Sequence, residues 1–272
     1  MNPVSQRPSV WSSVIGALVL ALAPVAKGQI GIGYTVGLTF TGVSPGTSVT
    51  MSAGGTNYGP GPSAGVYSFT ASGNPAFVSP FQTFCLEISQ FTNASTQTYT
   101  VVNLASASAN SLDDNIAAAG IGATRARNLQ ILYYNAFGPT FEATDFSTFF
   151  VNQVGTTADQ KKAAFQFAVW ELSHETDGNA FDLTAGGFKI TSPVLPAAEV
   201  AFANTLLSGV AAILASDAAT IAASQLQLLV LHHGTYQDQI VPIPEPEFVA
   251  ALMGALCLGT VWLRRRATAQ AA

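Results

Sequence analysis

The stretch "TTADQKKAAFQFAVWELSHET", residues 156–176, carries the clearest helix pattern of the chain. Thr157 is placed to cap the first turn, and Gln160 stands three residues later, where the two side chains can form a capping box. Apolar residues then recur on one face of the helix at Ala163, Phe167 and Trp170. The stretch therefore predicts a capped helix whose apolar stripe faces a core.

Three other segments have helical patterns. Residues 111–120, "SLDDNIAAAG", open with a Ser/Asp cap signal, and residues 124–137, "TRARNLQILYYNAF", repeat apolar residues at helical spacing. Residues 195–214, "LPAAEVAFANTLLSGVAAIL", place Pro196 at the start of a helix, where the missing N–H of proline costs least. We therefore expect a largely helical region in the middle of the chain.

Strand patterns lie on both sides of this region. Short segments alternate β-branched or aromatic residues with small polar ones, and turns rich in Gly, Pro and Asn separate them. The expected strands lie at 34–43, 47–53, 65–71, 81–89, 97–104 and 225–233, with a short one at the end of 179–190. This order predicts an α+β fold, an antiparallel β-sandwich or barrel-like sheet with a helical subdomain inserted between strands.

The composition and charge argue against a nucleic-acid partner. The 272-residue chain is 49% hydrophobic and only 9% charged, and its net charge is −5. Between Gln29 and Pro244 there are five basic and thirteen acidic residues, which gives a net charge of −8. Such a body would repel a phosphate backbone, so no nucleic-acid partner is expected. Many small residues with little charge are common in secreted bacterial surface proteins.

The first 28 residues have the features of a signal peptide. Arg7 supplies a positive n-region, residues 14–26 form an apolar h-region, and "AKG", which ends at Gly28, offers small residues at the expected cleavage positions. The apolar run is short for a membrane span. We therefore expect residues 29–238 to form an exported, extracellular domain.

The C-terminus has three parts in a fixed order. A proline-rich, acidic linker is expected at 239–247, an apolar stretch follows within 248–266, and three arginines end that stretch. The apolar stretch predicts a transmembrane helix, and the arginines favour the cytoplasmic side of the membrane. Hydropathy alone would equally predict an ordinary tail anchor.

This order of parts resembles the PEP-CTERM sorting signal of Gram-negative bacteria. The residues that carry the resemblance are Pro244, Glu245, Pro246, Arg264, Arg265 and Arg266. The resemblance implies that a membrane protease of the exosortase type recognises the triplet and removes the tail. It also implies that the C-terminal helix holds the protein in the membrane only transiently, and that the body is then extracellular or on the cell surface.

The cysteines point to a candidate site. Of the two in the chain, Cys257 lies in the tail that the sorting signal would discard, so Cys85 in "FCLE" is the one thiol of an exported body. Gln166 lies mid-helix between Phe165 and Phe167, and a buried glutamine needs partners for its amide. If the two side chains met, the sulfur could attack the amide carbon, expel ammonia and form an internal thioester.

The two motifs around Cys85 and Gln166 resemble those of the thioester domains of bacterial surface proteins. These domains pair an aromatic-Cys-apolar strand motif with an apolar-Gln-x-apolar-apolar helix motif that often ends in Trp. The resemblance spans roughly residues 37–231 and implies a Cys85–Gln166 thioester crosslink. The flanking apolar positions of the implied pocket are Phe84, Phe165, Phe167 and Trp170.

These features predict an exported surface or matrix protein that attaches covalently to amines on a partner protein or polysaccharide. Such capture is single-use, so we expect neither an enzyme nor a cofactor or metal. Two other interpretations stay open. One is a non-covalent structural protein of the exopolysaccharide or biofilm matrix, with Cys85 as an inert buried residue. The other is a cysteine hydrolase, with His174 as the base for Cys85.

Three weaker patterns have structural explanations. A charged cluster at the end of helix 156–176 could hold a metal, but with no second ligand set a solvated helix end explains it better. Its members are Glu171, His174 and Glu175. His232 and His233 point to opposite faces of a strand, which argues against joint binding of a metal. Residues 93–95, "NAS", match a glycosylation acceptor, but in a bacterial protein we interpret them as a turn.

Overall fold

The structure of the chain is a computed structural model. It describes residues 30–59, 62–77, 79–107, 120–139, 141, 146, 148–149, 155–175, 181–192, 197–242 and 259. Three predicted segments lie outside the described residues: the signal peptide, the helix at 111–120 and the transmembrane stretch. Within these segments only Gly120 and Gly259 are described. The sorting residues at 244–246 and 264–266 also lie outside the described residues.

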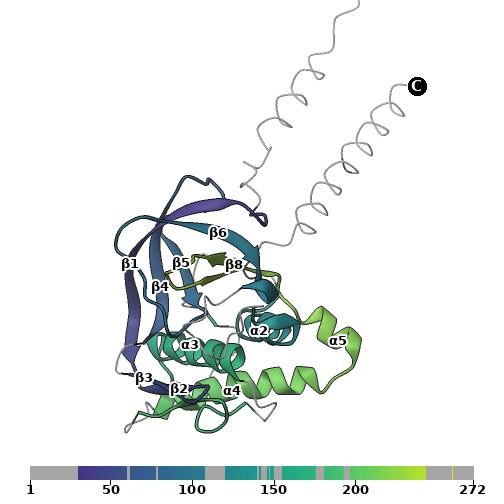
Figure 1. Cartoon of the computed structure of the whole chain (residues 1–272). Helices are drawn as coiled ribbons and strands as arrows, with labels where there is room; N and C mark the ends of the chain where they lie inside the picture. Colours follow the sequence, from purple (N-terminus) through teal and green to yellow (C-terminus); the bar gives the residue numbers. More distant parts are fainter. Residues whose placement is uncertain are drawn as a thin grey trace, which may run out of the picture.

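Six antiparallel strands close into a barrel (Figure 1). They are β1 (Thr35–Ser48), β4 (Ser63–Ser72), β5 (Phe81–Cys85), β6 (Gln97–Asn103), β8 (Leu228–His232) and β9 (Gln239–Pro242). Their order around the barrel is β1-β4-β5-β9-β8-β6, so each strand pairs with two neighbours and the barrel has no free edge. The prediction of an antiparallel, barrel-like sheet is confirmed.

The strand β9 corrects a predicted boundary. The sequence placed its residues in the linker at 239–247, but they pair with β5 on one side and with β8 on the other. All four residues of β9 are buried. Pro242 suggested a linker, yet it lies at the end of the strand, where a proline is tolerated because few ladder bonds are lost there. The barrel therefore extends at least to Pro242.

The helices lie between β6 and β8 in the chain. In the described residues they are the short 3-10 turn η1 (Leu104–Ser106), α2 (Gly122–Phe137), α3 (Ala158–His174), α4 (Ala197–Leu214) and α5 (Ala218–Ala223). α3 contacts the barrel strands β1, β4 and β5 as well as the helices α2 and α4. Figure 1 shows α3 between the barrel and α4, so α3 is the helix that joins the two parts of the fold.

The helix α3 forms as its sequence predicts. The Thr157 hydroxyl accepts the Gln160 N–H at 3.2 Å, and the Gln160 side chain accepts the Thr157 N–H at 2.9 Å, which completes the capping box. From Ala163 to His174 every residue is buried. Polar side chains in this part of the helix therefore have to find their partners inside the protein.

Three short strands form a second sheet in the order β3-β2-β7. They are β2 (Met51–Ala53), β3 (Thr56–Tyr58) and β7 (Phe188–Ile190). Gly54 and Gly55 connect β2 to β3 with positive φ values of 55° and 85°, which suit a two-residue hairpin. Because β7 follows α3 in the chain, this sheet ties the N-terminal strands to the segment after the central helix.

An aromatic cluster fills the space where β5, α2 and α3 meet. Phe84 packs on Phe165 with 4.6 Å between ring centroids, and Tyr133 packs edge-on against Phe165 at 4.9 Å. Phe137 lies 4.8 Å from Phe165, and Phe146 lies 4.8 Å from Phe84. These tilted and edge-on contacts are the favourable arrangements for aromatic rings, and they keep water away from the end of β5.

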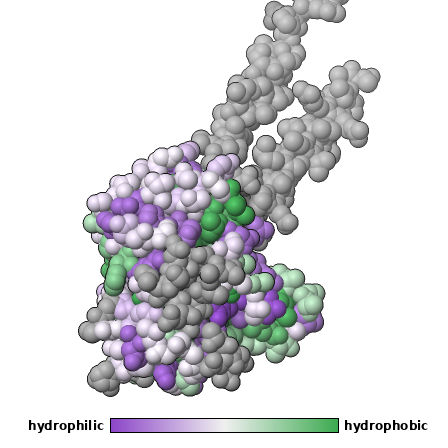
Figure 2. Space-filling model, in the orientation of Figure 1, coloured by the Kyte–Doolittle hydropathy of each residue, from purple (hydrophilic) through white to green (hydrophobic). Residues whose placement is uncertain are grey.

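Among the described helices, α4 is long and apolar enough to cross a membrane, with a mean hydropathy of 1.6 over its 18 residues. One such helix is weak evidence for a span, because a packed helix of a globular domain meets the same criterion. Its buried residues face α2 and α3. On the face drawn in Figure 2, apolar colour gathers in separate patches, one of them around α5.

Candidate functional site

The structure brings Cys85 and Gln166 together. Cys85 ends β5, Gln166 lies in the middle of α3, and both residues are fully buried. The Cys85 backbone N–H donates to Gln166 Oε1 at 3.0 Å, and Gln166 Nε2 donates to the Cys85 carbonyl oxygen at 2.8 Å. Two residues 81 positions apart are thus joined by a reciprocal pair of hydrogen bonds.

This geometry prepares the amide of Gln166 for attack. The Cys85 N–H polarises the amide carbonyl and is aimed at the oxygen that would carry negative charge in a tetrahedral intermediate. Because both bonds go to the backbone of Cys85, they bring the amide to the residue that carries the thiol. An acyl transfer between the two side chains would need this closeness.

Neighbouring contacts hold the two elements in register. The Leu86 N–H donates to the Asp238 carbonyl at 2.9 Å, which fixes the chain just beyond β5. The Ser173 hydroxyl, two turns after Gln166 on α3, lies 3.3 Å from the Leu86 carbonyl oxygen and 2.8 Å from the Val169 carbonyl oxygen of its own helix. Gln166 and Ser173 are seven residues apart and lie on one face of the helix. That face of α3 runs along the end of β5.

The four predicted pocket residues are all fully buried. Phe84 and Phe165 belong to the aromatic cluster, and Phe167 packs near Trp170 with 6.2 Å between ring centroids. Large buried apolar side chains therefore flank Cys85 on β5 and Gln166 on α3. A dry site of this kind protects a reactive acyl group from hydrolysis.

The sulfur of Cys85 lies in a closed environment. It contacts the Glu87 carbonyl oxygen at 3.5 Å, and Tyr67 and Trp170 are among its polar neighbours. Burial raises the pKa of the thiol to about 12, although the two neighbouring donors lower it. The thiol is therefore protonated at neutral pH and is a weak nucleophile toward molecules from solvent.

Next to the thiol lies a buried polar cluster that the sequence did not reveal. The Glu87 carboxylate accepts the Asp238 N–H at 3.0 Å, and the Gln237 side chain donates to the Glu87 carbonyl at 2.9 Å. The Asp238 carboxylate lies 2.9 Å from His232 Nδ1, and this contact raises the pKa of His232. Glu87 lies about 150 positions before Gln237 and Asp238 in the chain, so no local pattern indicates its contacts with them.

The charged end of α3 is buried, so its interpretation as a solvated helix end is wrong. Glu171 and His174 are fully buried, because the segment after α3 folds back over them. Glu171 Oε1 accepts the Asp182 N–H at 2.8 Å, and the Glu175 carboxylate accepts the N–H groups of Gly187 and Phe188 at 3.3 Å. Among the described residues no group of ligands could hold a metal ion.

The described hydrogen bonds of His174 do not include Cys85. Its Nδ1 lies 2.8 Å from the Ser173 hydroxyl and 3.1 Å from the Trp170 carbonyl, both on its own helix. The thiol also has the raised pKa that a catalytic cysteine avoids. The geometry therefore gives the hydrolase interpretation no support.

The remaining sequence patterns have local roles. His232 contacts Asp238, whereas His233 Nδ1 accepts the N–H groups of Thr235 and Tyr236. The two imidazole rings thus have separate partners, although the His233 backbone N–H also donates to the Asp238 carboxylate at 2.9 Å. Asn93 Oδ1 accepts the N–H of the serine two residues later at 2.7 Å, which is the hydrogen bond of an Asx turn.

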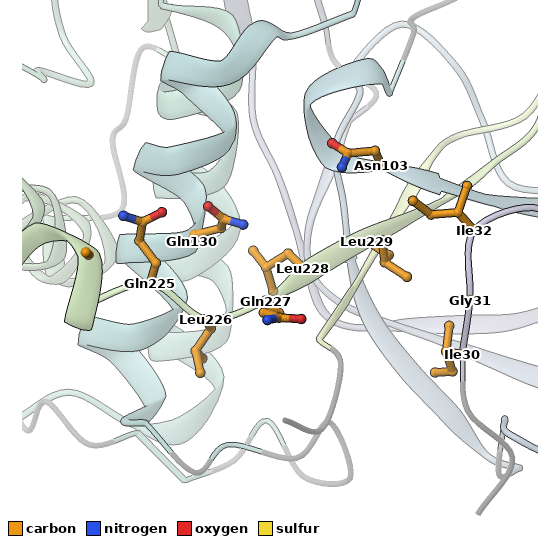
Figure 3. A pocket seen from close by; sticks show the side chains of 11 residues that line it. Ile30, Gly31, Ile32, Asn103, Gln130, Gln225, Leu226, Gln227, Leu228 and Leu229 are labelled. Carbon is orange, nitrogen blue, oxygen red and sulfur yellow. The ribbon is translucent and has the colours of Figure 1, made fainter. Parts of the chain in front are cut away.

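A cavity of about 560 Å³ lies away from the cysteine (Figure 3). Its lining residues are Ile30, Gly31, Ile32, Asn103, Gln130, Ala222, Gln225, Leu226, Gln227, Leu228 and Leu229. This lining contains four amide side chains, several aliphatic ones and no charged group. Within the described part of the chain, no hydrogen bond joins the side-chain amides of Gln130 and Gln227 to a partner. The cavity therefore offers an uncharged surface with free hydrogen-bonding groups.

Comparisons of the chain with protein family models, with curated proteins and with solved structures found no match.

Proposed function

We propose that the protein forms an internal thioester between Cys85 and Gln166 and uses it to attach covalently to an amine-bearing partner. The observation that carries this proposal is the reciprocal pair of hydrogen bonds between the two residues inside a buried aromatic site. A thioester needs proximity, a polarised carbonyl and exclusion of water. All three are supported by the contacts described above.

The bond forms by loss of ammonia. Cys85 Sγ attacks the amide carbon of Gln166, the C–N bond breaks, and the thiol proton leaves with the amide nitrogen as ammonia. The Cys85 N–H remains bonded to the acyl oxygen throughout. The high pKa of the thiol opposes this step, and the enforced closeness of the two groups favours it because effective concentrations in such pairs are very large.

Attachment is the second acyl transfer. An amine of the partner attacks the thioester carbon, the C–S bond breaks, and the sulfur takes up the proton that the amine loses. The product is an amide between Gln166 and the partner, with Cys85 as a free thiol again. Because the amide does not turn over, each molecule captures one partner and the protein is not an enzyme.

The cellular setting of the proposal comes from the two ends of the sequence. The signal peptide, the sorting triplet and the arginine cluster support export in a Gram-negative bacterium and processing by an exosortase-type protease. The partner would then be a surface or matrix protein, or an amine-bearing polysaccharide. In this proposal the helices between β6 and β8 act as an inserted subdomain that delivers Gln166 to the barrel.

Intact mass tests the proposal directly. The purified wild-type protein should be lighter by one ammonia than the mass of its processed sequence, whereas Cys85→Ala and Gln166→Ala should each have their full mass. Incubation with methylamine should add one methylamine to the wild type alone and restore a free thiol.

Two results would contradict the thioester: a wild type at full mass, or a thiol that reacts fully with alkylating reagent after denaturation without prior methylamine. Phe167→Leu serves as the matched control, because it changes an apolar wall of the site and leaves both reacting groups in place. It should keep the mass deficit.

The amide-lined cavity favours a second candidate function. An uncharged site with free amides and aliphatic surface suits a neutral sugar polymer, which needs hydrogen bonds and has no charge to pair. This supports a non-covalent structural protein of the exopolysaccharide matrix that has no thioester. That function predicts a wild type at full mass with no methylamine adduct, so the same mass measurement separates the two candidates.

A further inference from the structure

Gln239 is a buried amide that lies directly opposite Cys85. It begins β9, is fully buried, and pairs with Cys85 in the antiparallel register of β5 and β9. The Leu86 N–H donates to the Asp238 carbonyl at 2.9 Å, which makes Cys85 and Gln239 a pair without hydrogen bonds between their own backbones. In such a pair the Cα atoms are only about 4.5 Å apart, and the two side chains lie on the same face of the sheet. The side chain of Gln239 is therefore a direct neighbour of the thiol.

Only half of the Gln239 amide has a partner. Its Nε2 donates to the Gln237 carbonyl at 3.0 Å, whereas its Oε1 is buried and accepts no hydrogen bond from the described residues. The neighbour on the other side, Leu231 of β8, has an aliphatic side chain that cannot donate. The thiol of Cys85 is directed to the Glu87 carbonyl at 3.5 Å. Buried acceptors without a donor are rare because they have lost their hydrogen bonds to water. Such an acceptor beside a reactive atom suits a donor group on an incoming molecule.

The two glutamines near Cys85 contact different parts of it. The Cys85 N–H and carbonyl point away from β9, as the backbone groups of a non-hydrogen-bonded pair do, and they bond to Gln166 instead. This edge of β5 is open to Gln166 because the pairing of β5 with β4 ends at Thr83. Gln166 therefore holds the backbone of Cys85, whereas Gln239 lies beside its side chain.

We propose that Gln239 Oε1 accepts a hydrogen bond from the attacking amine and so places the amine nitrogen at the thioester carbon. The inference rests on the thioester function proposed above and adds to it the residue that binds the nucleophile. It also names the class of nucleophile that the site prefers. A primary amine keeps an N–H for Oε1 after it has given a proton to sulfur, whereas an alcohol has a single hydrogen and cannot do both.

The hydrogens of the amine balance in this step. When the amine attacks the Gln166 acyl carbon, its nitrogen forms the new C–N bond and becomes positively charged, with two hydrogens. One proton moves to the sulfur of Cys85 as the C–S bond breaks, and the other stays on the nitrogen of the product amide. A charged nitrogen donates a stronger hydrogen bond than a neutral one, so an acceptor fixed in this place stabilises the intermediate more than the free amine.

The experiment compares two changes at Gln239 with two nucleophiles. Gln239→Met keeps the length of the side chain and removes Oε1. Gln239→Glu keeps an acceptor, because burial raises the pKa of a carboxyl and holds it in its neutral form. Each protein is weighed to confirm the loss of ammonia, and the addition of methylamine or of ethanethiol is then followed by intact mass over time. Ethanethiol attacks the same carbon but has no N–H to donate to Oε1.

Gln239→Met should keep the mass deficit and react with methylamine about tenfold more slowly, which corresponds to one hydrogen bond to a charged atom. It should react with ethanethiol at the wild-type rate, and Gln239→Glu should recover the methylamine rate. A merely structural role for Gln239 would slow both nucleophiles alike, and that result would overturn the inference. Leu231→Met changes the other neighbour of Gln239 and leaves Oε1 in place, so it is the matched control and should keep both wild-type rates.

The methylamine adduct of the wild type provides a test that needs no variant. Peptide mapping should find the adduct on Gln166, and a crystal structure of this product should place its nitrogen about 3 Å from Gln239 Oε1. An adduct nitrogen without contact to Oε1 would overturn the inference. An adduct on Gln239 would also overturn it, because Gln239 would then itself carry the acyl group.

Two outcomes of the mass measurement separate the inference from the function on which it rests. If Gln239→Met folds normally but has its full mass, Gln239 acts in the formation of the bond and not in the capture of the amine, and the inference is wrong. If the wild type itself has its full mass, the thioester function fails first.

Discussion

Gln166 shows how one buried side chain can serve both stability and chemistry. Its amide satisfies the backbone N–H and carbonyl of Cys85, which would otherwise be unpaired at the end of β5. The same two bonds hold the amide of Gln166 next to the residue that carries the thiol. A glutamine with only a structural role would need to satisfy these backbone groups, but it would not need a thiol beside it. The lone thiol beside it is what makes the pair a candidate for reaction.

Glu171 gives a prediction about pH. Burial raises the pKa of its carboxyl from the ordinary value of 4.5 to about 8, despite the Asp182 N–H that it accepts. Because the folded pKa lies above the unfolded one, the stabilising contribution is complete below about pH 4.5 and is lost as the pH rises toward 8. Glu171→Gln keeps an acceptor for Asp182 and has no charge to bury.

The expected result is a difference between the two proteins that grows with pH. Relative to the wild type, Glu171→Gln should gain up to about 4 kcal/mol in the free energy of unfolding between pH 5 and pH 8. Urea unfolding followed by circular dichroism at both pH values measures this. A constant difference across the range would show that the carboxyl does not titrate in the folded protein. Glu199→Gln at the first turn of α4 is the control and should show no such trend.

The capping box at the start of α3 allows a prediction of how much one side chain adds to the stability of the whole helix. Thr157→Ala removes the side-chain acceptor of the Gln160 N–H and should lower the free energy of unfolding by about 1 kcal/mol, the usual value of an N-cap. Chemical denaturation gives the number. Thr157→Ser keeps the hydroxyl and should stay close to the wild type, whereas equal losses in both variants would argue that the cap bond contributes nothing.

Elements with a regular local pattern were predictable from the sequence, and those defined by distant partners were not. The start of α3 followed from Thr157 and Gln160, and the barrel strands followed from alternation of side chains. β9 was missed because Pro242 stands beside a proline-rich stretch, and its strand character depends on pairing with β5 and β8. No local pattern records such pairing.

The same distinction applies to the candidate site. Cys85 and Gln166 were identifiable from two short motifs and a family resemblance, although spacing along the chain says nothing about their contact. The buried cluster of Glu87 and Asp238 could not be found, because it joins segments about 150 residues apart. The burial of Glu171 was also missed, since helix ends with charges are usually exposed and here a later segment covers this one.

A thioester would change the stability of the whole molecule. It would join the barrel to α3 and close a loop of 81 residues, which by the chain-entropy model of crosslinks adds at most about 4–5 kcal/mol to the free energy of unfolding. Methylamine-treated wild type, in which the bond is open, should therefore melt at a lower temperature than untreated protein. Scanning calorimetry of the two samples measures the difference.

The control for this prediction is Cys85→Ala, which has no bond to open. Methylamine should leave its melting temperature unchanged, so any general effect of the reagent is seen there. Equal melting temperatures of treated and untreated wild type, with the adduct confirmed by mass, would mean that the crosslink does not constrain the unfolded chain.

The backbone of Cys85 also distinguishes the free glutamine from the product of attachment. Oε1 of Gln166 accepts the Cys85 N–H at 3.0 Å, and the Nε2 hydrogen on the same side as that oxygen reaches the Cys85 carbonyl at 2.8 Å. In a secondary amide, which is almost always trans, the carbon of the partner takes the place of that hydrogen. Attachment would therefore release the Cys85 carbonyl from its side-chain donor and turn the new tether toward the position that this bond occupied.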